Sequence, residues 1–174
     1  MKKRQKKERS TKAYSLSHVA PDGEARMVNV SEKPDTDRFA RAEGSIRMNA
    51  GTLDAIRRNS LAKGDVVSVA RVAGIMAAKR TAELIPLCHP LPIGEISVVL
   101  SPDEALPGLR CEATVRTKGP TGVEMEAITA VAVALITVYD MAKSMDRGMR
   151  INDICLLEKS GGRSGHWQRR DRTS

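Results

Sequence analysis

The order of predicted strands and helices indicates an α+β fold, a ferredoxin-like βαββαβ chain with helices packed on one face of an antiparallel sheet. Three observations predict it. Short segments alternate apolar and polar residues, a long helix rich in Ala and Gly ends at a group of prolines, and a second long helix is apolar nearly all round. A chain of 174 residues, 41% hydrophobic and 29% charged, has the size and composition of one globular domain.

The first half of the chain predicts a strand, a short helix and a long helix. Residues 41–48 alternate apolar or small residues with polar ones, which is the period of a strand with one buried face. Residues 50–59 predict a short helix. Residues 65–84 predict a long helix whose small residues, three and four positions apart, allow another helix or a sheet to approach closely. The prolines at 86, 90 and 92 end this helix.

The second half predicts two strands, a long helix and a last strand. Residues 95–100 and 109–117 are the strands, a Gly/Pro loop follows, the helix covers about 123–145, and 151–157 form the last strand. The stretch 127–138 has no polar stripe, whereas a helix packed on a sheet on only one side is amphipathic. We therefore expect another subunit to bury its second face.

The net charge of +8 is concentrated at the two ends of the chain. Residues 1–12 carry seven Lys or Arg and one Glu, and residues 166–174 carry three Arg and one Asp, so the body between them is neutral. We expect a basic disordered tail at 1–17, a single catalytic domain at 18–165 and a disordered tail at 166–174. Such tails ordinarily stay solvated and have no binding role. The alternative is that they bind weakly to RNA or to acidic surfaces.

Cysteine usage and hydropathy indicate a cytoplasmic protein. The three cysteines are odd in number and lack Cys-x-x-Cys spacing, which argues against a disulfide framework. Cys88 and His89 have no further residues at zinc-ligand spacing. The longest apolar run, 127–138, is shorter than a membrane span, and no hydrophobic region follows the basic N-terminus.

The most informative stretch is Leu-Ile-Pro-Leu-Cys-His-Pro-Leu-Pro at 84–92. Its prolines make a stiff, non-helical backbone that can hold one imidazole in place. A lone histidine in an apolar loop is more often structural, so the weight of His89 comes from three motifs downstream. These are Lys-Gly-Pro-Thr-Gly-Val-Glu-Met-Glu at 118–126, Val-Tyr-Asp-Met-Ala-Lys at 138–143 and Lys-Ser-Gly-Gly-Arg-Ser-Gly at 159–165.

Two of these motifs contain carboxylates with alternative roles. Asp140 and Lys143 share one helix face directly after an apolar run, where burial would alter their proton affinities and suit acid–base work. An ordinary surface ion pair is the alternative. Glu124 and Glu126 either complement the helix dipole or recognise a guanine-like edge. Both can face one ligand only if the first turn is irregular or one reaches a neighbouring subunit's site.

The Gly-rich run at 159–165 lacks the Walker spacing and is not a P-loop. A flexible linker is one interpretation. The other is a loop whose backbone amides approach phosphates beside Lys159 and Arg163.

Together, the four motifs resemble the cyclic pyranopterin monophosphate synthase family (MoaC) of molybdenum cofactor biosynthesis. The resemblance runs in order from about residue 19 to residue 165, and four motifs with similar gaps are specific where any one is weak. It implies a phosphorus–oxygen lyase that converts (8S)-3′,8-cyclo-7,8-dihydroguanosine 5′-triphosphate to cyclic pyranopterin monophosphate and releases pyrophosphate. It implies no redox cofactor, because the radical step lies upstream, and it leaves Mg²⁺ open as a companion of the triphosphate.

The resemblance also implies roles for individual residues. Asp140, Lys143 and Lys63 would be catalytic, although a loop lysine is ordinarily just solvated. The substrate-binding residues would be Leu87, Cys88, His89, Met125, Glu126, Glu124, Arg38 and Lys159. The resemblance supports Glu126 more strongly than Glu124, and the motif around Arg38 matches the family less closely. The cations among these residues would hold the triphosphate.

The resemblance further implies a homo-oligomer, a hexamer built from dimers, with active sites between subunits. Lys63 or Arg38 of one subunit is then expected to serve Asp140 and Lys143 of another. No membrane partner is expected.

Two other classes of function compete with this enzyme. A ferredoxin-like nucleotide- or RNA-binding module without catalysis would stack bases on aromatic residues of its strands, and no predicted strand contains one. A small-molecule-sensing regulatory domain would use the polar clusters as an effector pocket. Release of pyrophosphate from the cyclised nucleotide separates the three.

Overall fold

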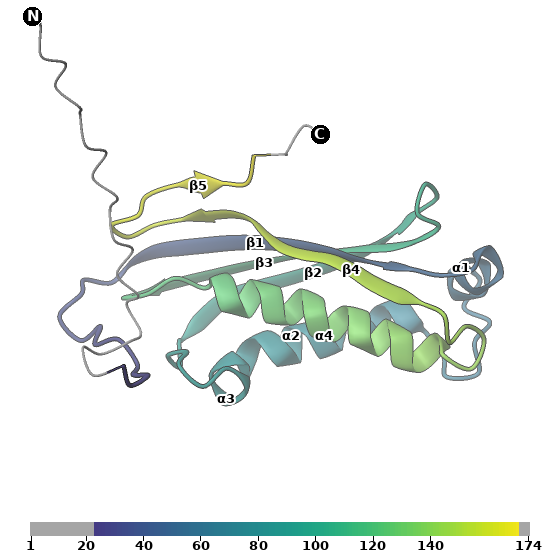
Figure 1. The fold of residues 1–174 in the computed structure, drawn as a ribbon, viewed down its shortest axis with the longest axis horizontal. Helices are drawn as coiled ribbons and strands as arrows, with labels where there is room; N and C mark the ends of the chain where they lie inside the picture. Colours follow the sequence, from purple (N-terminus) through teal and green to yellow (C-terminus); the bar gives the residue numbers. More distant parts are fainter. Residues whose placement is uncertain (1–22, 171–174) are drawn as a thin grey trace, which may run out of the picture.

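The computed structural model describes residues 23–170, and in them a five-stranded antiparallel sheet has its helices on one face (Figure 1). The strands lie in the order β2-β3-β1-β4-β5. Their bounds are β1 Thr36–Arg47, β2 Ile93–Asp103, β3 Gly108–Gly119, β4 Arg150–Ser160 and β5 Trp167–Gln168. The helices are α1 Ala50–Arg57, α2 Val66–Lys79, α3 Thr81–Leu84 and α4 Glu124–Ala142. The order of the first four strands confirms the ferredoxin-like prediction. The predicted tail at 1–17 lies outside the described residues.

Strand β1 begins earlier than its alternation predicts, at Thr36, because it pairs with β3 along its whole length, Thr36 opposite Gly119. The extension brings Phe39 into the sheet, where the guanidinium of Arg116 lies 4.5 Å from the ring centroid. The strands predicted from the sequence contain no aromatic residue, whereas the observed strands contain Trp167 in β5 and, through this extension of β1, Phe39. The Arg116 guanidinium covers one face of this ring, so that face is not open for stacking with a base.

The predicted helix at 65–84 is divided into α2 and α3, because the helical conformation is interrupted at Arg80. Asp65 caps α2 by accepting a hydrogen bond from the Ser68 amide at 2.9 Å. At the other end, the buried hydroxyl of Thr81 donates to the carbonyl of Ala78 at 3.0 Å. A side chain that competes for helix carbonyls favours a break there.

The core lies between the inner face of the sheet and the paired helices α2 and α4. The small residues of α2 predict that another helix packs closely against it, and α4 does so at Gly74. A Cβ added at Gly74 would lie only 2.8 Å from the carbonyl oxygen of Ala130 on α4. Helix α4 therefore has two neighbours within one chain, the sheet and α2. These two neighbours explain, without a second subunit, why most of the surface of α4 is apolar. An exception is Ile136, which is 56% exposed.

Helix α4 is also the one described helix that is long and apolar enough to cross a membrane, with 19 residues and a mean hydropathy of 1.6. By length, the prediction that no segment reaches a membrane span was therefore wrong. The helix is packed in the core, with Val131, Leu135 and Val138 fully buried. A buried core helix of this composition passes the same test.

The C-terminal segment departs from the predicted disordered tail at 166–174. Residues 167–168 form β5, which pairs with β4 so that Lys159 stands opposite Trp167. Residues 171–174 lie outside the described residues.

Candidate active site

The predicted site residues form two groups at opposite ends of α4. Glu124 is the first residue of this helix and Asp140 stands sixteen positions later. At a rise of 1.5 Å per residue, about 24 Å of helix separates them. Three of the four sequence motifs therefore meet at one end of α4, and the motif at 138–143 lies at the other end.

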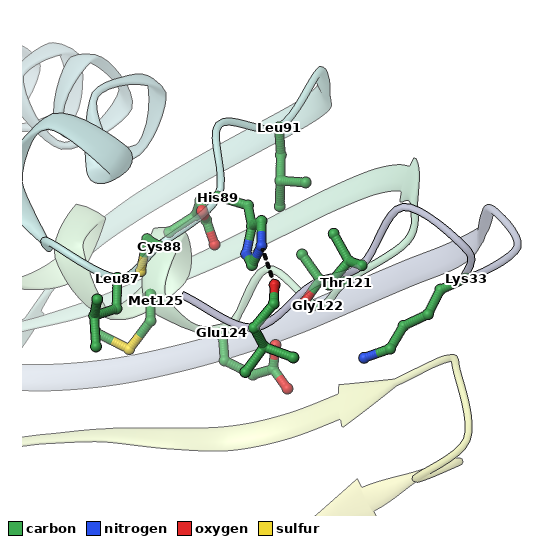
Figure 2. Close-up of a pocket in the computed structure, with 12 residues that line it drawn as sticks. Lys33, Leu87, Cys88, His89, Leu91, Thr121, Gly122, Glu124 and Met125 are labelled. Carbon is green, nitrogen blue, oxygen red and sulfur yellow. Dashed lines mark hydrogen bonds between the residues drawn. The ribbon is translucent and has the colours of Figure 1, made fainter. Parts of the chain in front are cut away.

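The first group lines a cavity of about 380 Å³ beside the proline-rich loop at 85–92, here called the loop cavity. The predicted residues Leu87, Cys88, His89, Met125 and Glu126 all line it. Figure 2 shows the ring of His89 directed at a backbone carbonyl, that of Val28, with Nε2 donating across 2.8 Å. This bond holds the imidazole in one orientation, as the stiff loop predicts.

Glu126 is the one charged residue of the predicted substrate-binding set that is buried, with 4% of the residue exposed. Burial raises the pKa of Glu126, and the nearby charge of Glu124 raises it further. Burial likewise raises the pKa of the Cys88 thiol, so Cys88 contributes an apolar wall and not a reactive thiolate. The cavity thus combines apolar walls with one carboxyl group whose pKa is raised by burial, so that it holds its proton to a higher pH than an exposed glutamate does.

Glu124 and Glu126 line the same cavity although they stand two positions apart. The reason is local. Glu124 leans back over Gly122, where an added Cβ would overlap its carboxylate, while Glu126 points into the fold. Val123 before the helix has φ −117° and ψ 27°, so the helix start is irregular, one of the two conditions that the sequence required.

A second cavity of about 590 Å³, here called the basic cavity, adjoins the first. Arg38 lines it and is held by two backbone carbonyls, with Nε donating to Gly119 at 3.1 Å and Nη2 to Pro120 at 3.0 Å. Lys159 also lines it, with Nζ 3.1 Å from the Glu124 carboxylate. Of the four cations expected to hold the triphosphate, Arg38 and Lys159 therefore face one hollow, whereas His89 lines the loop cavity and Lys63 lies at Asp140.

Four residues line both cavities: Lys33, Thr121, Gly122 and Glu124. The two cavities therefore form one continuous cleft. Lys33 was missed by the sequence analysis. It precedes Pro34 in a stretch without a motif, and only the fold brings it beside Thr121 (Figure 2). Its charge lies at the junction of the two cavities.

The second group is a cluster at the C-terminal end of α4, formed by Lys63, Asp140 and Lys143 and here called the Asp140 cluster. Lys143 Nζ donates to Asp140 Oδ1 at 2.7 Å, and Lys63 Nζ donates to Oδ2 at 2.9 Å. Lys63 thus meets Asp140 within one chain, which contradicts the Lys63 alternative of the expected exchange between subunits, and the Arg38 alternative stays a prediction.

The proton affinities in this cluster are altered, but not by burial. The Asp140 side chain is 55% exposed, so the expected burial is absent in the single chain. Hydrogen bonds from Lys143 and then Lys63 lower the pKa of Asp140 to about 2, and the same bond raises the pKa of Lys143. As it stands, the carboxylate is a weak base and the ammonium a weak acid near neutral pH. Substrate or a covering surface must change this balance for acid–base work.

In residues 23–170, His, Cys, Asp and Glu side chains do not gather in groups of three that would hold a metal ion. The charged residues that line the basic cavity are four cations and one carboxylate, Glu124, which is tied to Lys159. Mg²⁺ prefers an all-oxygen environment. The lining therefore fits an anion better than a metal ion.

Comparison with known proteins agrees with this geometry. Residues 27–162 match the model of the MoaC family. The chain is 61% identical over 153 residues to a cyclic pyranopterin monophosphate synthase of Methylobacterium sp. (strain 4-46), covering 88% of this chain and 96% of the relative. It is 58% identical over 156 residues to the one of Thermomicrobium roseum, covering 90% and 94% respectively. The match covers all four sequence motifs except the last three residues of the glycine-rich run, and the chain belongs to the MoaC family.

Proposed function

We propose that this chain is a cyclic pyranopterin monophosphate synthase. It converts (8S)-3′,8-cyclo-7,8-dihydroguanosine 5′-triphosphate to cyclic pyranopterin monophosphate and releases pyrophosphate, in molybdenum cofactor biosynthesis. The observation that carries the proposal is the continuous cleft, in which an apolar cavity with a buried carboxyl group adjoins a basic cavity. This arrangement suits a substrate with a purine-derived ring at one end and a triphosphate at the other.

The loop cavity is the proposed site of the purine-derived ring. A carboxylate can accept hydrogen bonds from the ring N–H and the exocyclic amine of a guanine-like edge together. Glu126 is placed for this role, and Leu87 and Met125 supply apolar contact. Hydrogen bonds from the ring would favour the charged carboxylate and so oppose the effect of burial, which raises the pKa of Glu126.

The basic cavity is the proposed site of the triphosphate. Arg38 presents a guanidinium whose orientation two backbone carbonyls fix before any ligand binds. Lys159 is paired with Glu124, so this carboxylate competes with a phosphate for the ammonium group. Any Mg²⁺ would arrive with the triphosphate and be held mainly by its phosphate oxygens.

In the proposed reaction a ribose hydroxyl attacks the α-phosphate. A new P–O bond closes the cyclic phosphate, the bond to the β-phosphate oxygen breaks, and pyrophosphate leaves with its negative charge stabilised by the cations of the basic cavity. The hydroxyl proton and the protons of the ring steps pass to and from positioned side chains. Asp140, Lys143 and Lys63 are the proposed acid–base residues.

The distance between the two groups of residues determines the proposed assembly. Proton transfer requires a heavy-atom distance of about 3 Å, or one bridging water. A substrate in the cleft therefore cannot use the Asp140 cluster of its own chain, about 24 Å away along α4. We propose that the Asp140 cluster of a second copy completes each cleft, within a hexamer built from dimers. Apolar side chains on the helix layer, Val69, Val72 and Met76 of α2, are about half exposed and available for contacts between copies.

The function is tested by incubating the purified protein with the cyclised nucleotide and measuring pyrophosphate and the pterin product. Stoichiometric release of both supports the enzyme. Binding of the nucleotide without turnover would favour a binding module or a sensing domain. We propose that the enzyme acts in the cytoplasm, where the nucleotide precursor is made.

Assembly has its own measurement. Light scattering at micromolar concentration is expected to give a mass several times the 18.9 kDa of one chain. A stable and active monomer would contradict the shared site.

Deletion of residues 1–12 is expected to leave kcat and KM unchanged at moderate salt. These residues carry most of the excess positive charge, whereas the proposed site lies between residues 28 and 164. The measurement is steady-state turnover of the shortened chain against the full chain. A large loss of turnover at unaltered oligomer size would place the segment in the site.

A further inference from the structure

The chain turns back sharply after β4 through a glycine-rich loop. Gly161, Gly162 and Gly165 have φ values of 103°, 67° and 60°, a region that residues with a Cβ rarely adopt. The loop is also crowded from one side. A Cβ at Gly162 would overlap the guanidinium of Arg38, so a glycine there lets the arginine pack against the loop backbone.

After this turn the chain returns along the edge of β4. Glu158 pairs with Gln168, and the backbone amide of Arg169 donates to the carbonyl of Leu157 at 2.7 Å. Figure 1 shows β5 running beside β4 with the loop joining them at one end. The two ends of the loop are thus tied to one another through the sheet.

A side-chain ion pair reinforces this closure. His166 Nε2 lies 2.9 Å from Glu158 Oε1, and the other carboxylate oxygen lies 3.3 Å from Arg41 Nη2. Arg41 in turn reaches Glu112 on β3 at 3.4 Å. The hydrogen bond with His166 is the main cause of the lowered pKa of Glu158. The charges facing Glu158 therefore come from β1 and from the returning segment.

The loop held in this way is a wall of the basic cavity. Its residues contribute five consecutive lining positions: Ser160, Gly161, Gly162, Arg163 and Ser164. Lys159 connects the loop to the rest of the cavity, with Nζ 2.6 Å from Ser164 Oγ and 3.1 Å from the Glu124 carboxylate. A change in the position of the loop would therefore move Lys159 and Arg163 together.

We infer that β5 and the His166–Glu158 pair form a clasp that positions the glycine-rich loop and so sets the affinity of the basic cavity for pyrophosphate-bearing ligands. The clasp residues His166 and Trp167 lie beyond residue 162, where the match to the MoaC family ends. Arg38 and Lys159 touch the ligand in the proposed function, on which this inference rests. His166, Glu158 and β5 are positioning residues that act through them.

Two shortened chains test the clasp. A chain ending at Gly165 lacks β5 and His166, and a chain ending at Arg170 keeps both and is the matched control. Calorimetric titration with inorganic pyrophosphate gives the affinity. If the unclasped loop holds its binding conformation about a tenth of the time, the Kd of the chain ending at Gly165 rises about tenfold, because apparent affinity scales with the competent fraction. The control keeps the Kd of the full chain.

Point variants separate positioning from general destabilisation. His166→Ala and Glu158→Gln are expected to raise KM by about two- to fivefold, as suits a partly exposed ion pair, with kcat unchanged. His166→Lys places an ammonium donor opposite Glu158 and is expected to keep KM near that of the unaltered chain. Glu95→Gln breaks another exposed ion pair, with Arg116 at 3.5 Å, and is expected to change neither constant.

Hydrogen exchange provides a measurement independent of turnover. Amide exchange in residues 160–165 is expected to accelerate in the chain ending at Gly165, including the Gly165 amide that donates to Gly162 at 3.1 Å in the full chain. Unchanged exchange overturns the clasp, and so does faster exchange with an unchanged pyrophosphate Kd. If the full chain binds pyrophosphate but does not turn over the cyclised nucleotide, the proposed function fails while these two comparisons still decide the clasp.

Discussion

Asp140→Asn and Lys143→Ala are each expected to lower kcat by ~10² to 10⁴, the usual cost of removing a general acid or base. Their side chains hydrogen-bond each other at 2.7 Å, and Lys63 completes the cluster from a distant loop. Loss of either member removes a proton carrier and leaves the other without its partner. The measurement is single-turnover pyrophosphate release, which is not limited by product dissociation.

The matched control for these variants is Asp54→Asn. It removes an exposed carboxylate on α1 that pairs with Arg58 and that contacts none of Lys63, Asp140 and Lys143 through a hydrogen bond or ion pair. Turnover of the control is expected to equal that of the unaltered chain. Near-normal turnover in Asp140→Asn would end the assignment of Asp140 as a catalytic residue.

Stability gives an independent check on Asp140. Its pKa in the folded chain is about 2, below the ordinary 3.8, so its stabilising contribution is complete above pH 3.8 and is lost as the pH falls through about 2. Asp140→Asn is therefore expected to have the lower melting temperature at neutral pH. The difference should narrow as the pH falls towards 2, and a difference independent of pH would show that the two lysines do not stabilise the carboxylate.

Mixing two inactive variants is expected to restore activity when they come from opposite ends of α4. Glu126→Gln alters the loop cavity and Lys143→Ala alters the Asp140 cluster. If each site combines these two regions from different copies, every mixed dimer contains one unaltered site. Random exchange at equal amounts then gives about a quarter of the normal activity, since half of the dimers are mixed and each has one working site of two.

The pair Lys63→Ala and Lys143→Ala serves as the control for subunit exchange. Both residues bind Asp140 of their own chain, so every site in a mixed assembly lacks one of them, and activity should stay near background. Exchange itself is verified with labelled subunits. Failure of the Glu126→Gln mixture to recover, despite exchange, would mean that each site is built within one chain.

Local patterns in the sequence determined most of the secondary structure. The alternation in 109–117 corresponds to β3, and the apolar run at 127–138 lies within α4. Such periods are encoded within a few consecutive residues and are visible without the fold. The early start of β1 was not visible, because Thr36 joins the strand by pairing with Gly119 and not through its neighbours in sequence.

Motifs in the sequence likewise identified residues that line the cleft, among them His89, Glu126 and Lys159. Only the tertiary structure decided which side chains and segments, predicted or not, lie next to one another. Lys63 reaches Asp140 across 77 positions of sequence, Lys33 enters the junction of the two cavities, and β5 closes on β4. Each of these contacts joins segments that are far apart in sequence or turned back on each other. Residue order constrains such contacts only through the whole fold, because a side chain's neighbours in space are set by sheet order, helix packing and loop direction together.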